Sequence, residues 1–186
     1  MESALDYPCP QCKSDMMLKM LTMSSEIPYF GEHTQITIVC DSCGWKHTDF
    51  IPSEGEKPGL WKINVDNIEK LSARVIRSSS CTIKIAALDL EASPGSGSSG
   101  YVSNVEGILN RFIDAVAIIL NDCDEEILEK ANEMINMLEG VKEGNRGVTI
   151  ELLDPKGRSQ IIHDDAMHRE LTKTEKEELQ TGFEYQ

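Results

Sequence analysis

The chain has 186 residues, of which 40% are hydrophobic, so it is long enough to bury the core of one domain or of two small ones. Its formal net charge is -14, which disfavours nucleic acid as a partner because binding to phosphates comes largely from Lys and Arg. No apolar run is long enough to span a membrane, and the N-terminus MESALDYPCP lacks the layout of a signal peptide, so we expect a cytoplasmic protein without membrane contact.

Two CxxC pairs stand near the N-terminus, Cys9 with Cys12 and Cys40 with Cys43. Two such turns can supply the four thiolates that tetrahedral zinc prefers, and a closed thiolate shell leaves no position for a catalytic water. A redox-active pair is the alternative, but a thioredoxin-like site has a single pair beside a βαβ pattern, and these pairs have none around them. The spacing therefore predicts one structural zinc ion.

The remaining candidate ligands are histidines and isolated cysteines. His33 and His47 lie near the pairs in sequence, but four cysteines already fill a zinc shell, so we expect ordinary surface histidines. Cys81 and Cys123 stand alone and are expected to be buried thiols, because free cysteine is among the most buried residue types.

The segments around the pairs predict strands at residues 16–24, 34–40 and 46–51, which form a zinc ribbon within residues 1–56. The Pro-, Gly- and charge-rich residues 52–59 mark the boundary to a second domain. One strand is rich in methionine, a residue that fills cores and also lines adaptable binding surfaces, and the core interpretation is favoured. These methionines are Met16, Met17, Met20 and Met23.

The midpoint between the two CxxC pairs places Ile27, Pro28, Tyr29 and Phe30 at the tip of the ribbon, far from zinc. A lone two-stranded hairpin is barely stable in water, so this tip must contact something. Packing against the second domain and contact with a partner both fit. Our hypothesis is that at least one of Tyr29 and Phe30 is exposed and contacts a protein client.

The second domain, residues 57–165, begins with predicted strands at 60–65, 73–78 and 81–91. The Gly- and Ser-rich residues 93–100 lack the Lys-Ser/Thr ending of a phosphate-binding loop and are interpreted as a flexible connector.

A helical hairpin is predicted at about residues 104–140, because the apolar period changes there from two to about 3.6. Asn104 is the expected N-cap of its first helix, and Gly140 is expected to end the second. The apolar faces are Val105, Ile108, Leu109, Phe112, Val116 and Ile119 in the first helix, and Ile127, Leu128, Ala131, Met134, Ile135 and Leu138 in the second.

The last part of the chain predicts a β-hairpin over residues 147–163, with its turn at residues 154–157 and its returning strand at Ile161. Residues 166–186 are expected to be a tail that is partly helical. Two overlapping capping-box patterns support this helix, Thr172 with Glu175 and Thr174 with Glu177.

Catalytic groups are sparse. His163 and His168 are five residues apart, which is poor spacing for one helix face, and no nucleophile stands beside a base. Asp89, Glu91 and Glu106 are better explained as solvated or structural carboxylates. The sequence thus predicts that the chain is not an enzyme.

Six motifs in a fixed order span nearly the whole chain: CPQC, IPYFGE, CDSCGW, SARVIRSSSCTIKIAALDLE, NVEGIL and TIELLDPKGRS. In this order they resemble the ZPR-type zinc-finger family, specifically its single-module archaeal members. The resemblance implies zinc ligation by Cys9, Cys12, Cys40 and Cys43. It also implies a fold that is mainly β with a helical hairpin, in which a zinc ribbon precedes a double-stranded β-helix-like domain, the A domain.

Eukaryotic members of this family carry the module twice, bind elongation factor 1-alpha as its folding chaperone, and also bind receptor tyrosine kinase domains. The resemblance therefore implies a protein-interaction module that binds elongation factor 1-alpha or assists its folding. The acidic charge fits this expectation, because complementary charge speeds the encounter with a basic partner. The alternative function is a nucleic-acid-binding zinc ribbon of the transcription or translation machinery.

Overall fold

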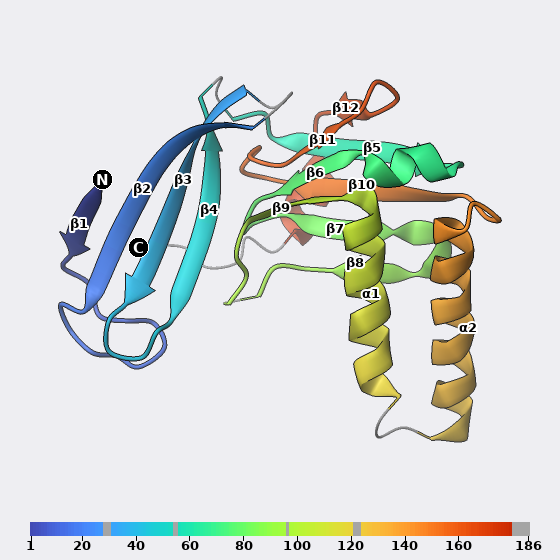
Figure 1. Cartoon of the computed structure of the whole chain (residues 1–186), viewed down its shortest axis with the longest axis horizontal. Coiled ribbons are helices and arrows are strands. Elements are labelled where there is room, and N and C mark those ends of the chain that lie inside the picture. The colour runs from blue at the N-terminus through green and yellow to red at the C-terminus, as the bar shows by residue number, and fades with distance from the viewer. Residues whose placement is uncertain (28–30, 54–55, 96, 121–123, 180–186) are drawn as a thin grey trace.

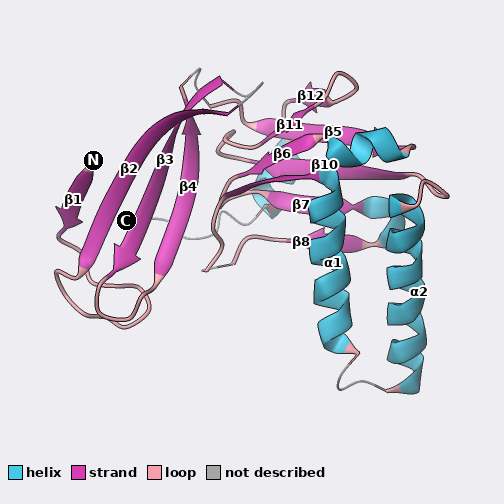
Figure 2. Cartoon of the chain, viewed as in Figure 1, coloured by secondary structure: helices cyan, strands magenta, loops and turns pink. Residues whose placement is uncertain are grey.

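The computed structural model describes residues 1–27, 31–53, 56–95, 97–120 and 124–179, and the side chains of Ile27 and Ile119 lie outside the description. Strands dominate the chain and helices are few, as Figure 2 shows. No helix among the described residues is both long and apolar enough to span a bilayer. The fold is therefore mainly β with a helical hairpin, as the sequence predicts.

The N-terminal part is a four-stranded antiparallel sheet in the order β1-β2-β3-β4 (Figure 1). Its two long central strands pair from Leu18 opposite Cys40 to Ile27 opposite Gly31, which confirms the predicted strands and extends them toward the tip. The first strand was not predicted. The strands are β1 (Glu2–Leu5), β2 (Leu18–Ile27), β3 (Gly31–Cys40) and β4 (Lys46–Pro52).

The second part, which we call the β-domain, has two facing sheets. The five-stranded sheet has the order β12-β5-β10-β7-β8 and the three-stranded sheet has the order β11-β6-β9. The larger sheet contains β5 (Gly59–Val65), β7 (Thr82–Ile85), β8 (Leu90–Ala92), β10 (Val148–Asp154) and β12 (Met167–Arg169). The smaller one contains β6 (Arg74–Arg77), β9 (Tyr101–Asn104) and β11 (Gln160–Ile162), and the short 3-10 helices η1 (Ile68–Ser72) and η2 (Ala86–Leu88) connect strands.

The main hydrophobic core lies in the β-domain and includes residues of both sheets and both long helices. Alternate residues of β5 and β10 point into it, as expected for strands with one buried face. Its fully buried members include Ile63, Val75, Ile85, Ile150 and Leu152.

The helical hairpin consists of α1 (Val105–Ile119) and α2 (Glu125–Lys142), which run side by side away from the sheets (Figure 1). The Asn104 side chain accepts a hydrogen bond from the Gly107 amide, which confirms the predicted N-cap. The predicted end of α2 at Gly140 is wrong, because the helix continues to Lys142 and the left-handed glycine that follows it is Gly144, with φ of 76°.

The apolar faces of the hairpin are only partly buried. In α1 the residues from Val105 to Val116 that were predicted to face inward are buried. In α2, however, Ile127 and Leu128 are 46% and 37% exposed, whereas Leu138 is fully buried. The first turns of α2 thus extend past the edge of the core.

The predicted strand at residues 81–91 is interrupted. The chain leaves β7, forms η2 and passes through Asp89, which has a left-handed φ of 51°, before β8 begins. A left-handed residue cannot continue a flat strand, so one predicted strand becomes two short antiparallel ones.

The predicted hairpin at residues 147–163 is wrong in its pairing. The turn exists, since the Gly157 amide donates to the Asp154 carbonyl and Gly157 has φ of 69°. Yet β10 pairs with β5 and β7, whereas β11 pairs with β6 in the other sheet. The turn therefore carries the chain between layers, and the buried Asp154 carboxylate holds it by accepting from Ser78, Ser80 and Ser159.

The ribbon docks on the β-domain through β4 (Figure 1). Asp49 accepts hydrogen bonds from the Ser79 amide at 3.0 Å and the Ser79 hydroxyl at 2.9 Å, and it pairs with Arg158 at 3.2 Å. Beside these contacts, Phe50 packs on Ile76. We call Asp49, Ser79 and Arg158 the interdomain lock.

The interpretation of residues 93–100 as a flexible connector is incomplete. Ser99 accepts from the Thr48 amide, and the Gly100 amide donates to the Thr48 carbonyl at 2.6 Å. A Cβ at Gly100 would lie only 3.0 Å from an Asp49 oxygen, so glycine permits this close approach. The end of the segment is thus part of the docking surface.

The C-terminal segment contributes β12, which pairs with β5, and the short helix α3 (Lys173–Glu178). The Thr172 hydroxyl accepts from the Glu175 amide, and the Glu175 carboxylate accepts from the Thr172 amide. This reciprocal pair confirms the first of the two predicted capping boxes.

Candidate metal centre

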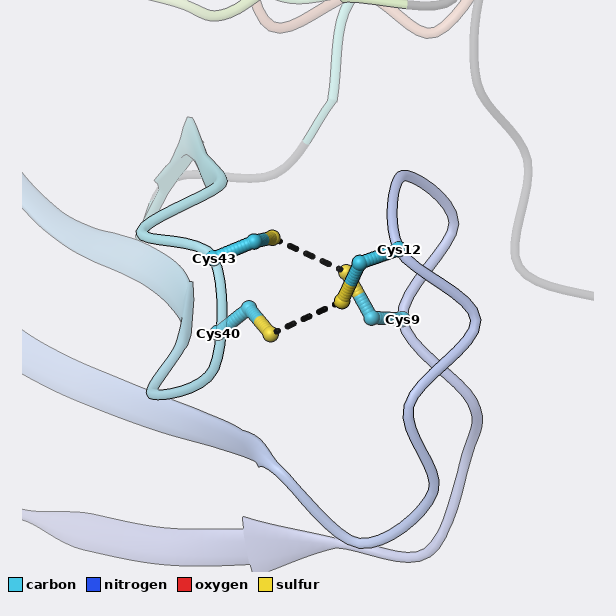
Figure 3. Close-up of side chains that lie close together, drawn as sticks. All are labelled: Cys9, Cys12, Cys40 and Cys43. Carbon is cyan, nitrogen blue, oxygen red and sulfur yellow. Dashed lines mark hydrogen bonds between the residues drawn. The ribbon is translucent and has the colours of Figure 1, made fainter.

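The four paired cysteines come from two similar turns of the ribbon. Cys9 and Cys12 lie on the loop between β1 and β2, whereas Cys40 ends β3 and Cys43 lies on the turn before β4 (Figure 3). In each turn the amide four residues after the first cysteine donates back to that cysteine's carbonyl at 2.9 Å, from Lys13 to Cys9 and from Gly44 to Cys40.

The residue that closes each turn has a left-handed backbone. Its φ is 61° at Lys13 and 74° at Gly44. Glycine adopts this conformation without steric cost, which explains its position directly after the second pair. The two turns therefore hold both sulfurs of each pair toward the same point.

The sulfur atoms have the spacing of a tetrahedral zinc shell. All four lie within 4.8 Å of one another, with 3.8 Å between Cys9 and Cys43 and 3.7 Å between Cys12 and Cys40. Zn–S bonds of about 2.3 Å at tetrahedral angles require sulfur–sulfur distances of about 3.8 Å. The four cysteines thus form a zinc-finger site that fits one structural zinc ion.

Electrostatics favour a cation at this point. Hydrogen bonds from the Ser14 side chain and backbone lower the pKa of Cys12 to about 6. At Cys43 the Trp45 backbone also lowers the pKa, but desolvation and the neighbouring sulfurs outweigh it and raise the pKa to about 12. The four sulfurs cannot all ionise side by side without positive charge, and a divalent zinc ion supplies that charge.

Two family models match the chain: the ZPR1 zinc-finger domain over residues 3–55 and the ZPR1 jelly-roll domain over residues 69–183. The second match alone covers more than half of the chain. The chain belongs to the ZPR1 family. The β-domain is accordingly a jelly roll, which agrees with the predicted double-stranded β-helix-like fold.

Two archaeal relatives of the ZPR1 family match over most of their length. A ZPR1-like protein of Pyrococcus horikoshii is 35% identical over 94% of this chain and 80% of its own. One of Methanocaldococcus jannaschii is 33% identical over 98% of this chain and 93% of its own. This chain therefore spans most of the length of each of these two relatives.

Eukaryotic ZPR1 proteins match as well, but the matched region is a smaller part of each. The protein named zinc finger chaperone zpr1 of Schizosaccharomyces pombe is 28% identical over 82% of this chain and 34% of its own. Zinc finger protein ZPR1 of Drosophila melanogaster is 29% identical over 87% of this chain and 36% of its own. This chain therefore spans about a third of these relatives.

The two ribbon histidines are buried, so the prediction of surface histidines is wrong. His33 is 2% exposed, contacts Phe50 and lies 3.2 Å from the Ser25 hydroxyl. His47 is 5% exposed and stacks on Trp45, and burial lowers its pKa. Side chains of the ribbon itself, Phe50 and Trp45, thus lie against the two histidines that the sequence predicts to be exposed.

The methionines of the ribbon lie mostly outside its core. Met16, Met17 and Met23 are 75%, 45% and 57% exposed, and Met20 packs against the small core beside zinc. Side chains alternate along β2, so Leu18 and Met20 face inward while Met23 faces solvent. The core interpretation is therefore correct only for Met20.

Several predicted residues lie outside the described structure. Pro28, Tyr29 and Phe30 belong to this group, as do the side chain of Ile27 and the whole of Cys123. The client-binding hypothesis for the ribbon tip thus stays a prediction. Cys81, in contrast, is fully buried as expected, and burial raises its pKa to about 12.

The carboxylates considered as catalytic candidates have structural surroundings. Glu91 pairs with Lys84 at 2.9 Å and accepts from the Ser93 hydroxyl, and these contacts lower its pKa. Glu106 lies in the first turn of α1, where a negative charge is favoured. Sequence reasoning missed the interdomain lock, because Asp49 and Arg158 are far apart in the chain and no local pattern joins them.

Proposed function

We propose that this ZPR1-family protein is a zinc-dependent interaction module that binds elongation factor 1-alpha and assists its folding. The observation that carries the proposal is the closed four-cysteine zinc site in a family with a member named a zinc finger chaperone. Because four thiolates fill the shell, zinc has a structural role and leaves the surface of the ribbon to make contacts. A chaperone of this kind needs no catalytic residue, so the proposal includes that the chain is not an enzyme.

Charge supports a basic protein partner over nucleic acid. The formal net charge is -14, and four thiolates with one zinc ion make it more negative still. Such a field attracts a basic surface and repels phosphates. We place the interaction in the cytoplasm, where elongation factor 1-alpha works.

The ribbon tip is the proposed contact surface, with Ile27, Pro28, Tyr29 and Phe30 meeting the client. The proposed domain division assigns residues 1–56 to the ribbon, 57–165 to the jelly roll with its hairpin, and 166–186 to a C-terminal tail whose strand β12 joins the larger sheet of the jelly roll. The lock at Asp49 supports a ribbon presented in a fixed orientation rather than on a loose linker.

The test is a pull-down of purified elongation factor 1-alpha with the zinc-loaded chain, with the factor in its GTP, GDP and nucleotide-free forms. We expect retention of at least one form, and an increased yield of active factor when the chain is present during its refolding. Retention of none of the three forms would refute the proposal. A gel shift at low salt checks the alternative, and a strong shift with RNA or DNA would favour the nucleic-acid-binding ribbon.

The tip is tested by the double variant Tyr29→Ala with Phe30→Ala. Retention of the factor should fall, while the melting temperature stays within a few degrees of the parent. Tyr7→Ala is the matched control, because Tyr7 is a 52% exposed aromatic of the same ribbon. If the double variant keeps binding but melts at a lower temperature, the pair is core and the contact lies elsewhere.

A further inference from the structure

A pocket of about 370 Å³ opens in the jelly roll between α1 and the strands β7, β8 and β9. Sites for small molecules commonly have volumes of about 300–1,000 Å³ and mostly apolar walls with a few polar groups. The walls of this pocket fit that description, because they include Ile83, Leu90, Ile108, Phe112, Ala115 and Val116.

The basic groups of the pocket are Arg77 and Arg111, whose side chains both lie near the ring of Tyr101. The guanidinium carbons of Arg77 and Arg111 lie 5.6 Å and 4.1 Å from the centre of the Tyr101 ring. Arg77 is only 7% exposed and donates to the carbonyls of Ser99 and Cys81, which fix its position. Arg111 is exposed at the rim and is oriented by its contact with the ring.

Within the described part of the chain, neither Arg77 nor Arg111 forms an ion pair, although acidic residues outnumber basic ones by 32 to 18. Elsewhere Arg158 pairs with Asp49 and Glu56, and Arg169 pairs with Glu175. Arg77 is the buried one of the two, and because a buried cation without a carboxylate partner is costly, an incoming anion would relieve that cost.

One carboxylate does line the pocket, but its charge is already matched. Glu91 pairs with Lys84 at 2.9 Å and accepts from the Ser93 hydroxyl at 2.6 Å. The unmatched charge of the pocket is thus positive, in a protein that is negative as a whole.

We propose that this pocket binds a small amphipathic carboxylate, an apolar body with a single carboxylate head. The body packs on Ile108 and Phe112, and the head accepts hydrogen bonds from Arg111 and Arg77. The planar guanidinium group matches a carboxylate with two parallel N–H donors, which makes arginine the suitable residue for this head. The site involves neither zinc nor the ribbon tip, so it goes beyond the proposed function and does not depend on it.

The test uses decanoate as the probe, below the concentration at which it forms micelles, with the full zinc-loaded chain labelled for amide NMR. Decanoate should cause saturable shifts at amides of α1 and β7–β9 and leave those of β1–β3 unchanged. Decanol should bind at least tenfold more weakly, and decylamine should not bind there. If decanol binds as well as decanoate, or if no saturable shift occurs at these amides, the proposal is wrong.

Variants of the chain distinguish the binding of the carboxylate head from the binding of the apolar body of the ligand. Arg111→Gln should weaken decanoate binding about tenfold or more, because a charged hydrogen bond is lost, and should leave decanol binding unchanged. Arg146→Gln makes the same change of charge at an exposed position outside the pocket and should have no effect. Ala115→Phe fills the cavity and should abolish binding of both probes. Unchanged decanoate affinity in Arg111→Gln would contradict the assignment of the head.

Discussion

The ribbon and the jelly roll are stabilised by different means. The small core of the ribbon comprises Leu18 and Ile38 together with two zinc ligands, Cys9 and Cys40, whereas the jelly-roll core extends over both sheets and both long helices. Burying one Leu or Ile side chain is worth about 1.5–3 kcal/mol. Structural zinc bound to a short finger peptide is worth roughly 10–16 kcal/mol at neutral pH. Metal therefore dominates the stability of the ribbon, and apolar burial dominates that of the jelly roll.

The largest expected effect comes from removing one zinc ligand. Cys40→Ser should lose the zinc ion and unfold β1–β4, while the jelly roll keeps its structure. Zinc content per chain and amide NMR measure the two outcomes. The control Cys81→Ala removes a buried sulfur of the jelly roll and should keep one zinc per chain. If the ribbon stayed folded in zinc-free Cys40→Ser, the conclusion that metal dominates the stability of the ribbon would be wrong.

The second largest expected effect concerns the apolar core of the jelly roll. Ile150→Ala removes a fully buried side chain of β10 and should lower the free energy of unfolding of the jelly roll by about 2–5 kcal/mol. Zinc affinity should not change. Urea unfolding measures the loss, and Met167→Ala, at a position 54% exposed, should stay within about 0.5 kcal/mol of the parent. A parallel loss of zinc from Ile150→Ala would show that the regions share one core.

Removing the interdomain lock tests how far the ribbon and the jelly roll are independent. Asp49→Ala removes the acceptor of Ser79 and one of the two carboxylate partners of Arg158, and it should cost about 1–3 kcal/mol, because buried donors lose their acceptor. A double-mutant cycle with Ser79→Ala should give a coupling free energy above about 0.5 kcal/mol. If the losses of stability in Asp49→Ala and Ser79→Ala simply add in the double variant, the contact between Asp49 and Ser79 does not join the two regions. Glu126→Ala is the control, since its exposed ion pair with Lys130 should contribute about 0.5 kcal/mol or less.

The smallest predicted effect concerns α3. Hydrogen bonding to Arg169, with a further contribution from Thr172, lowers the pKa of Glu175 to about 2. A lowered carboxylate pKa stabilises the folded form above the ordinary pKa, so α3 should keep this support above about pH 4.5 and lose it as the pH falls toward 2. Amide shifts of residues 173–178 against pH report the change.

Thr172→Ala should destabilise the same helix by about 1 kcal/mol through loss of the cap. Glu177→Gln alters the second capping pattern, which the structure does not use as the cap, and should leave α3 unchanged. An equal effect of both variants would rule out the capping box at Thr172.

Local patterns predicted local structure well. The two CxxC turns, the Asn104 cap and the Thr172 capping box depend on residues close in sequence, and the structure has each of them. Long-range pairing was harder to predict. The turn that ends at Gly157 is compatible with a hairpin and with a crossover, and only the strands available on each side decide between them.

Burial and long-range contacts could not be predicted for a similar reason. His33 and His47 belong to polar stretches of the ribbon, and they are buried with Phe50 and Trp45 against them in the folded ribbon. Asp49 and Arg158 are separated by 109 residues, so a single sequence gives no sign that they meet. The zinc ligands were predictable because each half of the site is a local motif.

The most direct test of the account is residue-resolved amide hydrogen exchange of the whole chain, with zinc and after its removal by a chelator. We predict that protection is lost throughout β2, β3 and β4 when zinc is removed and is retained in β5, β7 and β10. Loss of protection in both regions together, or in neither, would contradict the conclusion that zinc holds the ribbon and apolar burial holds the jelly roll.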